Sequence, residues 1–198
     1  MKPLMIASVL LGLASTARAQ APTTGDVRLD LFRGACIESA ADAGRIRSLG
    51  WTTTAPAADP RLAELLTAIG QVEAEADEEA APVSPYRRSV DGKTYYLLLI
   101  DVQSAYAQLE GCVLYDFDAS GPLDPALITR WLNARPDKVD DQPGSILGHY
   151  WDIAGQDGIF GVNSAFLTRG GRGAQQARFW GLALATTVRV GEPIQIVR

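Results

Sequence analysis

The sequence contains only one histidine and two cysteines among 198 residues, and this scarcity restricts the chemistry that it can support. Zinc takes four nitrogen, sulfur or oxygen ligands, so a single histidine would need carboxylates or both cysteines beside it. The cysteines do not form a Cys-x-x-Cys pair, which argues against a thioredoxin-like redox centre. We therefore expect no metal and no other cofactor.

Basic residues are also scarce, with 18 Lys and Arg against 23 Asp and Glu and a formal net charge of −5 at pH 7. Proteins that bind nucleic acids carry a basic surface that neutralises phosphates, so this balance excludes nucleic acid as a partner. The sequence has no basic stripe for anionic lipid either.

Long apolar runs are confined to the N-terminus. Lys2 precedes an apolar run at residues 4–14, and Ala17-Arg18-Ala19 places small residues before a cleavage site. The run is shorter than the roughly 20 residues of a membrane-spanning helix. We expect residues 1–19 to be a cleavable signal peptide, which places the mature protein, from about Gln20, in the periplasm or outside the cell. The alternative is an uncleaved anchor or a buried helix, and no later segment predicts stable membrane insertion.

Residues 20–198 are predicted to form a single domain, because a chain of this length can bury about 70% of its unfolded surface. Apolar spacings of three and four residues predict a helix over residues 26–49. Aspartate followed by proline, at Asp59-Pro60 and Asp124-Pro125, marks the start of two further helices. Strands are expected at residues 86–90, 93–102, 109–117, 149–153, 159–167 and 177–190, with a hairpin turn at Asp91-Gly92.

The order of these elements predicts an α+β domain with a mainly antiparallel sheet of five to six strands. Two N-terminal helices and one crossover helix would pack on the sheet and give two layers. Neighbouring residues of a strand face opposite ways, so Tyr95 and Tyr96 are not expected to lie in the core together, and one of them should lie on the exposed face or under a helix.

Cys36 and Cys112 both lie in the predicted mature part, and an even pair in an oxidising compartment predicts a disulfide. Two buried free thiols or a redox pair are the alternatives. The bond would place the Cα atoms about 4.4 to 6.8 Å apart. Strand alternation puts Cys112 on the same face as Leu114 and Asp116, so the helix that carries Cys36 must cover that face. Asp116, at the end of the strand, is expected to turn toward solvent.

The segment 116–124 resembles a calcium-binding loop, because oxygen-bearing residues occupy its positions 1, 3, 5 and 9. Position 12 is Leu127, however, where such loops need a bidentate glutamate. The alternative is that the strand ends, a turn follows and Asp124 caps a helix. The candidate metal ligands are Asp116, Asp118, Ser120 and Asp124.

His149 is the one candidate histidine base, with Asp152 three residues after it and Ser145 four residues before it. A hydrolase needs a nucleophile, a base and an orienting group close together. Residues 144–148 do not match the Gly-x-Ser-x-Gly elbow, and a structural histidine is the alternative. Arg169 and Arg172 lie in a glycine-rich stretch that predicts either an anion cradle or a flexible hairpin loop.

Three short segments, Phe32-Arg33-Gly34-Ala35-Cys36, Gly50-Trp51 and Gly111-Cys112, resemble a group of small exported proteobacterial proteins of unknown function. The resemblance covers mainly residues 27–51 and Cys112. It implies export and paired cysteines, and it implies no activity and no catalytic residue.

The expected function is a non-catalytic binding or protein-interaction module of the cell envelope, such as an inhibitor, an adaptor or an accessory subunit. The basis is that the sequence has no assembled nucleophile and base, no metal cluster and no phosphate-binding loop. Its partner would be another envelope protein or a small ligand, and the sequence leaves the oligomeric state open. The alternative is a small envelope hydrolase that uses His149 with Ser145 or a nearby carboxylate.

The mature protein is expected to bind no calcium specifically, because the loop at residues 116–124 lacks its bidentate ligand. Calorimetric titration of the metal-free protein with Ca²⁺ should show no saturable heat. A dissociation constant near or below the micromolar range, lost in the Asp116→Ala variant, would contradict this prediction.

Overall fold

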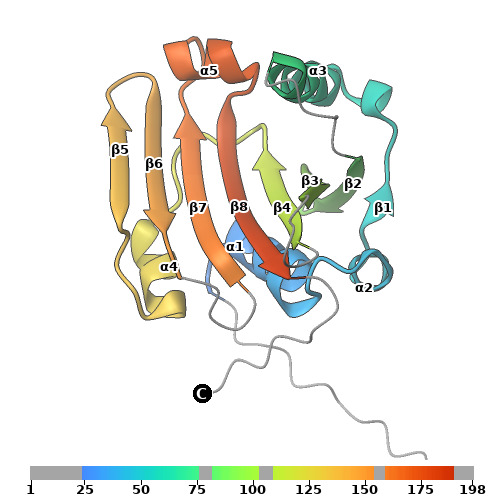
Figure 1. The fold of residues 1–198 in the computed structure, drawn as a ribbon, viewed down its shortest axis with the longest axis horizontal. Helices are drawn as coiled ribbons and strands as arrows, with labels where there is room; N and C mark the ends of the chain where they lie inside the picture. Colours follow the sequence, from blue (N-terminus) through green and yellow to red (C-terminus); the bar gives the residue numbers. More distant parts are fainter. Residues whose placement is uncertain (1–23, 76–81, 103–108, 154–158, 190–198) are drawn as a thin grey trace, which may run out of the picture.

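One antiparallel sheet of eight strands runs through the described residues, which are 24–75, 82–102, 109–153 and 159–189 of the computed structural model (Figure 1). The strand order is β1-β2-β3-β4-β8-β7-β6-β5. Each half of the chain therefore supplies four adjacent strands, and the halves meet where β4 pairs with β8. The strands are β1 (Thr52–Thr53), β2 (Val83–Val90), β3 (Lys93–Val102), β4 (Leu109–Asp116), β5 (Lys138–Gln142), β6 (Ile146–Trp151), β7 (Ile159–Leu167) and β8 (Gly181–Arg189).

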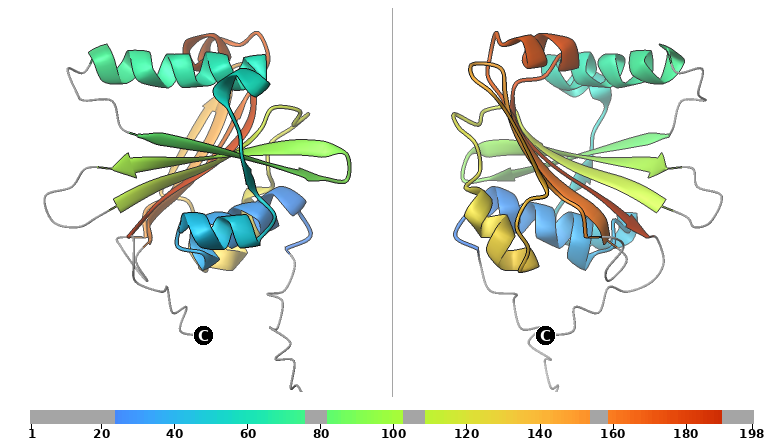
Figure 2. Two further views of the ribbon diagram at one scale, coloured as in Figure 1. Left: turned by 90° about the vertical axis from the view of Figure 1, so that its right-hand side faces the viewer. Right: turned by 60° about the vertical axis from the view of Figure 1, so that its left-hand side comes forward.

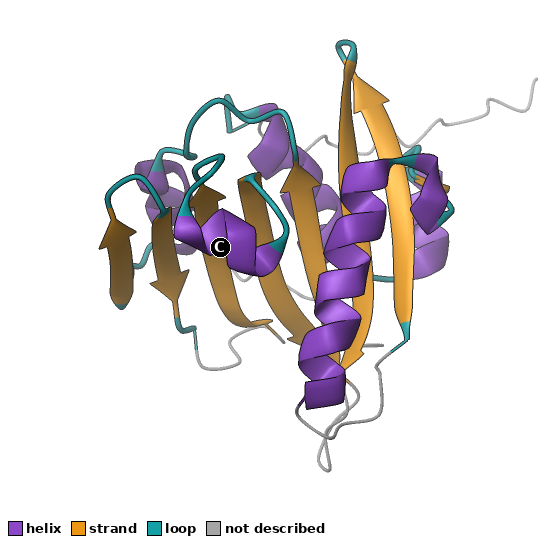
Figure 3. Cartoon of the chain, turned by 90° about the horizontal axis from the view of Figure 1, so that it is seen from above, coloured by secondary structure: helices purple, strands orange, loops and turns teal. Residues whose placement is uncertain are grey.

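Helices cover both faces of this sheet, so the fold has three layers (Figure 2). The helical segments before β1, which we call the N-terminal helices, pack on one face together with α4. We call this face the disulfide face; it carries Tyr95, Cys112 and Leu114. The other face, which we call the α3 face, carries Tyr96 and Tyr115 beneath α3 and α5 (Figure 3). The helical segments are α1 (Val27–Phe32), the π-helical η1 (Arg33–Glu38), α2 (Ala43–Ser48), the 3₁₀ turn η2 (Pro56–Ala58), α3 (Pro60–Glu75), α4 (Pro125–Leu132) and α5 (Arg172–Ala177).

The α+β class and the antiparallel pairing are confirmed, but the predicted five to six strands and two layers are wrong. The two unpredicted strands are the sheet edges: β1 has two residues, and β5 is polar and largely exposed. Neither shows the apolar–polar alternation that identifies a half-buried strand. The glycine-rich sequence around α5 predicts a loop, whereas the structure forms a helix there that buries Ala174 in the core.

Tyr95 and Tyr96 show why a third layer is needed. They point to opposite faces, as alternation requires, yet they expose only 2% and 5% of their surface. Tyr95 belongs to the core beneath the N-terminal helices, and Tyr96 belongs to a second core beneath α3. The two face opposite ways as expected, but both lie in a core, because each face of the sheet has its own covering helices.

The predicted continuous helix over residues 26–49 is wrong, because the chain breaks between η1 and α2. Ala40 and Ala41 take left-handed φ values of 50° and 54°, which an α-helix cannot contain. Asp42 then caps α2 by accepting the Arg45 backbone N–H at 2.8 Å. The predicted apolar stripe is nevertheless buried, because the short segments turn the same side to the sheet. Five of its six members expose at most 3% of their surface, namely Leu29, Phe32, Cys36, Ser39 and Ile46, whereas Ala43 is only partly buried.

Three short-range signals in the sequence are confirmed. Asp59 and Asp124 each cap a helix by accepting the backbone N–H two residues further on, at 2.8 and 2.9 Å. Asp91 and Gly92 have φ values of 50° and 77°, the pair of positive values that a type I′ hairpin turn requires. This turn sets the register in which Lys93 begins β3.

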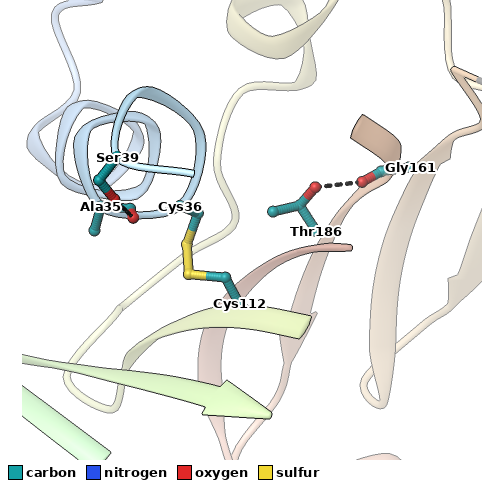
Figure 4. The surroundings of a disulfide bond; sticks show 6 residues. All are labelled: Ala35, Cys36, Ser39, Cys112, Gly161 and Thr186. Atoms are coloured by element: carbon teal, nitrogen blue, oxygen red, sulfur yellow. Dashed lines mark hydrogen bonds between the residues drawn. A yellow bond between two sulfur atoms is a disulfide. The ribbon is translucent and has the colours of Figure 1, made fainter. Parts of the chain in front are cut away.

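The predicted disulfide between Cys36 and Cys112 is confirmed, with Cα atoms 5.5 Å apart (Figure 4). It joins η1 to β4, and both cysteines are fully buried. The N-terminal helices are thereby held over the disulfide face. The expectation that Asp116 turns toward solvent is wrong, since this residue is only 2% exposed. The segment before α1 and the loop after β4 line the same cavity as Asp116.

Two observations bear on localisation. The disulfide fits an oxidising compartment, and no helix among the described residues is both long and apolar enough to cross a membrane. Residues 1–19, the predicted signal peptide, lie outside the described residues. Cleavage near Ala19 therefore stays a prediction.

Replacing both cysteines by alanine should lower the free energy of unfolding by about 4 to 5 kcal/mol, because the bond links residues 76 positions apart in the unfolded chain. Urea unfolding of the Cys36→Ala/Cys112→Ala variant against the oxidised protein, followed by circular dichroism, measures the loss. Wild-type protein kept in reductant is the control, since it retains both side chains and lacks only the bond. A loss below about 1 kcal/mol in both reduced samples and variant would show that the bond contributes little.

Candidate functional site

A polar cavity of about 340 Å³ lies between the start of α1, the start of β3 and the end of β4. We call it the Asp116 cavity, after the deeply buried carboxyl group in its wall. Its volume is at the lower end of the range of small-molecule sites. The polar residues that line it are Asp26, Arg28, Lys93, Tyr95, Asp116 and Ser120.

Asp26 and Arg28 form one wall through a helix-capping ion pair. The Asp26 carboxylate accepts the Arg28 backbone N–H at 2.9 Å, and it binds the guanidinium through Nε at 3.0 Å and Nη2 at 2.7 Å. Arg28 Nη1 also donates to the carbonyl oxygen of Gly121 at 3.3 Å. The bond to Gly121 connects the start of α1 to the loop after β4. Because Nε, Nη1 and Nη2 of Arg28 all donate to protein oxygens, they are less available to a ligand.

Lys93 and Tyr95 reach the cavity from β3, because residues two apart in a strand share a face. Lys93 is exposed at the start of the strand, next to the hairpin turn, whereas the Tyr95 ring is buried. Within the part of the chain that the structure describes, the Lys93 ammonium and the Tyr95 hydroxyl form no hydrogen bond. Both groups therefore remain available to a molecule in the cavity.

Asp116 ends β4, where it pairs with Leu182 of β8. One oxygen of its carboxyl group accepts the Asp118 backbone N–H at 3.0 Å and so shapes the following loop. Gly181 has a φ of 115°, and a Cβ atom at this position would overlap the carbonyl oxygen of Asp116. Glycine at 181 is thus required for the backbone of Asp116 to take its position.

The pKa values of the two carboxyl groups of the cavity, Asp116 and Asp26, are shifted in opposite directions. Burial raises the pKa of Asp116, and the hydrogen bond from the Asp118 backbone N–H and the positive charges of Arg28 and Lys93 offset this effect only in part. Burial also raises the pKa of Tyr95, and the charge of Asp116 adds to the rise. Burial opposes the ionisation of Asp26 as well, but its hydrogen bonds with Arg28 outweigh burial and lower its pKa. Asp116 is therefore the carboxyl group whose charge the protein compensates least.

On the α3 face, an aspartate, an arginine and a tyrosine also lie together, and there they are hydrogen-bonded to one another. Asp59 caps α3 and binds the Arg61 guanidinium at 3.0 Å, and Arg61 Nη1 donates to Asp118 at 2.7 Å. The Tyr96 hydroxyl donates to Asp59 Oδ2 at 2.8 Å. The Arg61 hydrogen bond lowers the pKa of Asp59 to about 2, and burial together with the bond to Asp59 raises the pKa of Tyr96 to about 12. Every polar group of this network has a protein partner.

Around the Asp116 cavity, the corresponding groups do not form a complete hydrogen-bond network with one another among the described residues. Asp26, Arg28 and Tyr95 repeat the capping aspartate, the paired arginine and the strand tyrosine. The Tyr95 hydroxyl nevertheless has no hydrogen-bond partner among the described residues, and Asp116 has only a backbone N–H. The cavity therefore presents a hydroxyl, an ammonium group and a carboxyl group to a small polar molecule.

Only two of the four candidate calcium ligands line this cavity. Asp116 and Ser120 do so, whereas the Asp118 carboxylate accepts from Arg61 and the Asp124 carboxylate caps α4. Among the described residues, no group of three or more His, Cys, Asp or Glu side chains is placed to hold a metal ion. The carboxylates of residues 116–124 thus have different hydrogen-bond partners and do not converge on one point among the described residues.

The candidate residues near the histidine are also separated. His149 lies within β6 and stacks on Trp151, with 6.0 Å between ring centroids. Asp152 lies beyond the end of β6, in the wall of a cavity of about 410 Å³ that is also lined by Tyr150 and Asn163. Ser145 lies in the turn before β6, and its hydroxyl accepts the Gly173 backbone N–H at 2.9 Å. The structure does not bring these three side chains together.

Asp26, Arg28 and Lys93 are polar cavity residues that the sequence does not single out, and Tyr95 stands out only as a strand residue. Lys93 and Tyr95 carry a usable signal, since they follow a recognisable turn and alternate onto one face. Asp26 and Arg28 repeat the Asp-x-Arg spacing found at the start of α3. That these residues meet Asp116 depends on the tertiary fold and has no signal in the sequence.

No protein-family model, no curated protein and no solved structure matches this chain. The resemblance to small exported proteobacterial proteins therefore stays a prediction. The site has to be interpreted from its own chemistry.

The Asp116→Asn variant should be more stable than the wild type at neutral pH. The native pKa of Asp116 is raised above its ordinary value of 3.8, so the folded state holds an extra proton between the two values. The contribution of Asp116 to stability is thus present below the unfolded pKa and is lost as the pH rises through the native pKa. Asparagine still accepts the Asp118 N–H but does not titrate.

Urea unfolding of both proteins from about pH 3 to about pH 8 measures this difference. The Asp124→Asn variant is the matched control, since it keeps its helix cap and leaves Asp116 in place. A stability difference between wild type and Asp116→Asn that does not change with pH would contradict the prediction.

Proposed function

We propose that this protein is a non-catalytic, extracytoplasmic binding module that holds a small zwitterionic molecule, such as a free amino acid, in the Asp116 cavity. The main support for this proposal is the difference in hydrogen bonding between the two faces of the sheet. The same residue types form mutual hydrogen bonds around Arg61 but surround an open cavity around Asp116. A buried carboxyl group with a raised pKa in the wall of a cavity is a physical marker of a functional site.

The charges of the cavity favour a ligand that carries both signs. Asp26 and Arg28 neutralise each other at 2.7 Å. Asp116 is then the acceptor for an ammonium group, and Lys93 is the partner for a carboxylate. The Tyr95 hydroxyl supplies a further donor or acceptor.

Ligand binding would offset the cost of burying Asp116. An ammonium group beside the carboxylate favours the ionised form and lowers the pKa. Binding should therefore release protons at pH values near the native pKa of Asp116. The affinity should fall as the pH drops, because a protonated Asp116 no longer attracts the ammonium group.

The proposed location is the periplasm or the cell exterior, after cleavage near Ala19. The fully buried disulfide supports an oxidising compartment. Another envelope protein is the alternative partner to a small ligand.

A hydrolase that uses His149 with Ser145 is the rival function. It would require Ser145 to leave the Gly173 N–H and to approach His149. The two functions differ in one variant: His149→Ala should abolish hydrolysis of an ester substrate, and it should leave amino-acid binding in the Asp116 cavity unchanged.

Calorimetric titration with each common amino acid tests the proposal. At least one should bind, and Asp116→Asn should weaken its binding about tenfold or more, since a charge-assisted hydrogen bond contributes about 1.5 to 3 kcal/mol. Lys93→Met should weaken binding as well, and Asp124→Asn should not. Repeating the titration in two buffers of different ionisation enthalpy measures the released protons.

Three outcomes would contradict the binding function. One is that none of the amino acids binds with a dissociation constant below about 1 mM. Another is that a ligand binds equally well to Asp116→Asn. The third is that neutral sugars bind in the cavity and amino acids do not.

A further inference from the structure

Three arginines lie close together at the β7–β8 connection of a chain whose overall charge is negative. Arg169, Arg172 and Arg178 are all exposed, whereas the formal net charge is −5. The ion pairs among the described residues involve other arginines, so none of these three has an acidic partner there. This segment is thus a local positive surface on an acidic protein.

Two of these arginines line a cavity of about 390 Å³ between α3 and α5, which we call the α3–α5 cleft. Figure 3 shows the two helices lying over the same side of the sheet. The Arg169 guanidinium stacks on the Trp180 ring, 5.1 Å from its centroid, and Arg178 lies at the end of α5. Glu64 of α3 is the one acidic residue in the wall. The cleft therefore combines two cations, an aromatic ring and a single anion.

The segment that carries the arginines is held in place by its own packing. Gly171 has no room for a Cβ atom, which would meet the Gly144 carbonyl oxygen, and Gly173 donates to Ser145 Oγ at 2.9 Å. Gln175 Nε2 donates to the Gly170 carbonyl at 3.1 Å. These contacts fix α5 against the β5–β6 turn. The guanidiniums are thus presented from a rigid base, which reduces the entropy lost on binding.

We infer that the α3–α5 cleft binds an acidic polypeptide segment of a partner protein. Guanidinium groups bind carboxylates through two parallel hydrogen bonds, and stacking on Trp180 orients Arg169 for this contact. Arg172, at the start of α5, adds a further exposed positive charge to the same segment, so a ligand with several carboxylates would match it. A single small anion would leave at least one arginine without a partner. This inference is independent of the ligand proposed for the Asp116 cavity.

Fluorescence anisotropy with a labelled peptide of alternating Glu and Ala tests the inference on the full mature chain. The peptide should bind at low ionic strength and dissociate as salt screens the charges. Arg178→Gln and Arg169→Gln should each raise the dissociation constant about tenfold. Arg130→Gln, on α4 in the opposite layer, is the matched control for loss of one exposed positive charge and should have no effect.

Arg178→Gln is the decisive variant, because the exposed Arg178 side chain forms no hydrogen bond, ion pair or ring contact among the described residues. Thermal melting checks that both variants are folded. Equal weakening by Arg130→Gln would overturn the inference, since it would show unspecific attraction. Unchanged binding in Arg178→Gln, equal binding of a Gln–Ala peptide, or equally tight binding of polyphosphate through the same arginines would overturn it as well.

Discussion

The burial of one face of β4 is the constraint on which the rest of the structure depends. Cys112, Leu114 and Asp116 alternate along this strand and expose 2% of their surface or less. The bond from Cys112 to Cys36 holds η1 over the strand, and α1, directly before η1, brings Asp26 and Arg28 to its end. A covalent link at one point of the strand thus encloses an ionisable group four residues further on.

The two faces of the sheet carry similar sets of polar residues, but these residues are hydrogen-bonded differently on each face. Each has a capping aspartate, an arginine two residues later and a strand tyrosine, and each meets a carboxylate from the loop or strand end near residue 117. On the α3 face all of these groups hydrogen-bond to one another, which favours a rigid corner. On the disulfide face the carboxyl group is deeper and lacks such a partner. A buried carboxyl group whose charge the protein offsets only in part is a marker of sites where a ligand or a reaction uses that charge.

Short-range patterns in the sequence predict the local structure well. The caps at Asp59 and Asp124, the turn at Asp91-Gly92 and the pairing of the two cysteines all depend on neighbouring residues or on a forced choice of partner. The edge strands have no such pattern, because a strand with little buried surface needs no apolar alternation. The break at Ala40 and Ala41 has no glycine or proline to mark it.

The candidate site could be predicted only in part for a related reason. Asp116 and Ser120 stand out through their spacing, but their grouping with Arg28, Lys93 and Tyr95 arises from segments far apart in the chain. The position of Asp116 at a strand end favours solvent exposure on local grounds alone. Its burial follows from which segments cover it, and that depends on the packing of the whole N-terminal layer.

The division of the sheet into two sets of four consecutive strands has a consequence for how the molecule assembles. Within each set most pairings join strands close in sequence and have a low entropic cost of closure, whereas the β4–β8 seam joins residues such as Asp116 and Leu182 across a long loop. The disulfide lies wholly within the first half and does not shorten that loop. All residues that line the Asp116 cavity belong to the first half, and the second half contributes through Gly181, whose lack of a side chain lets β8 pair beside Asp116.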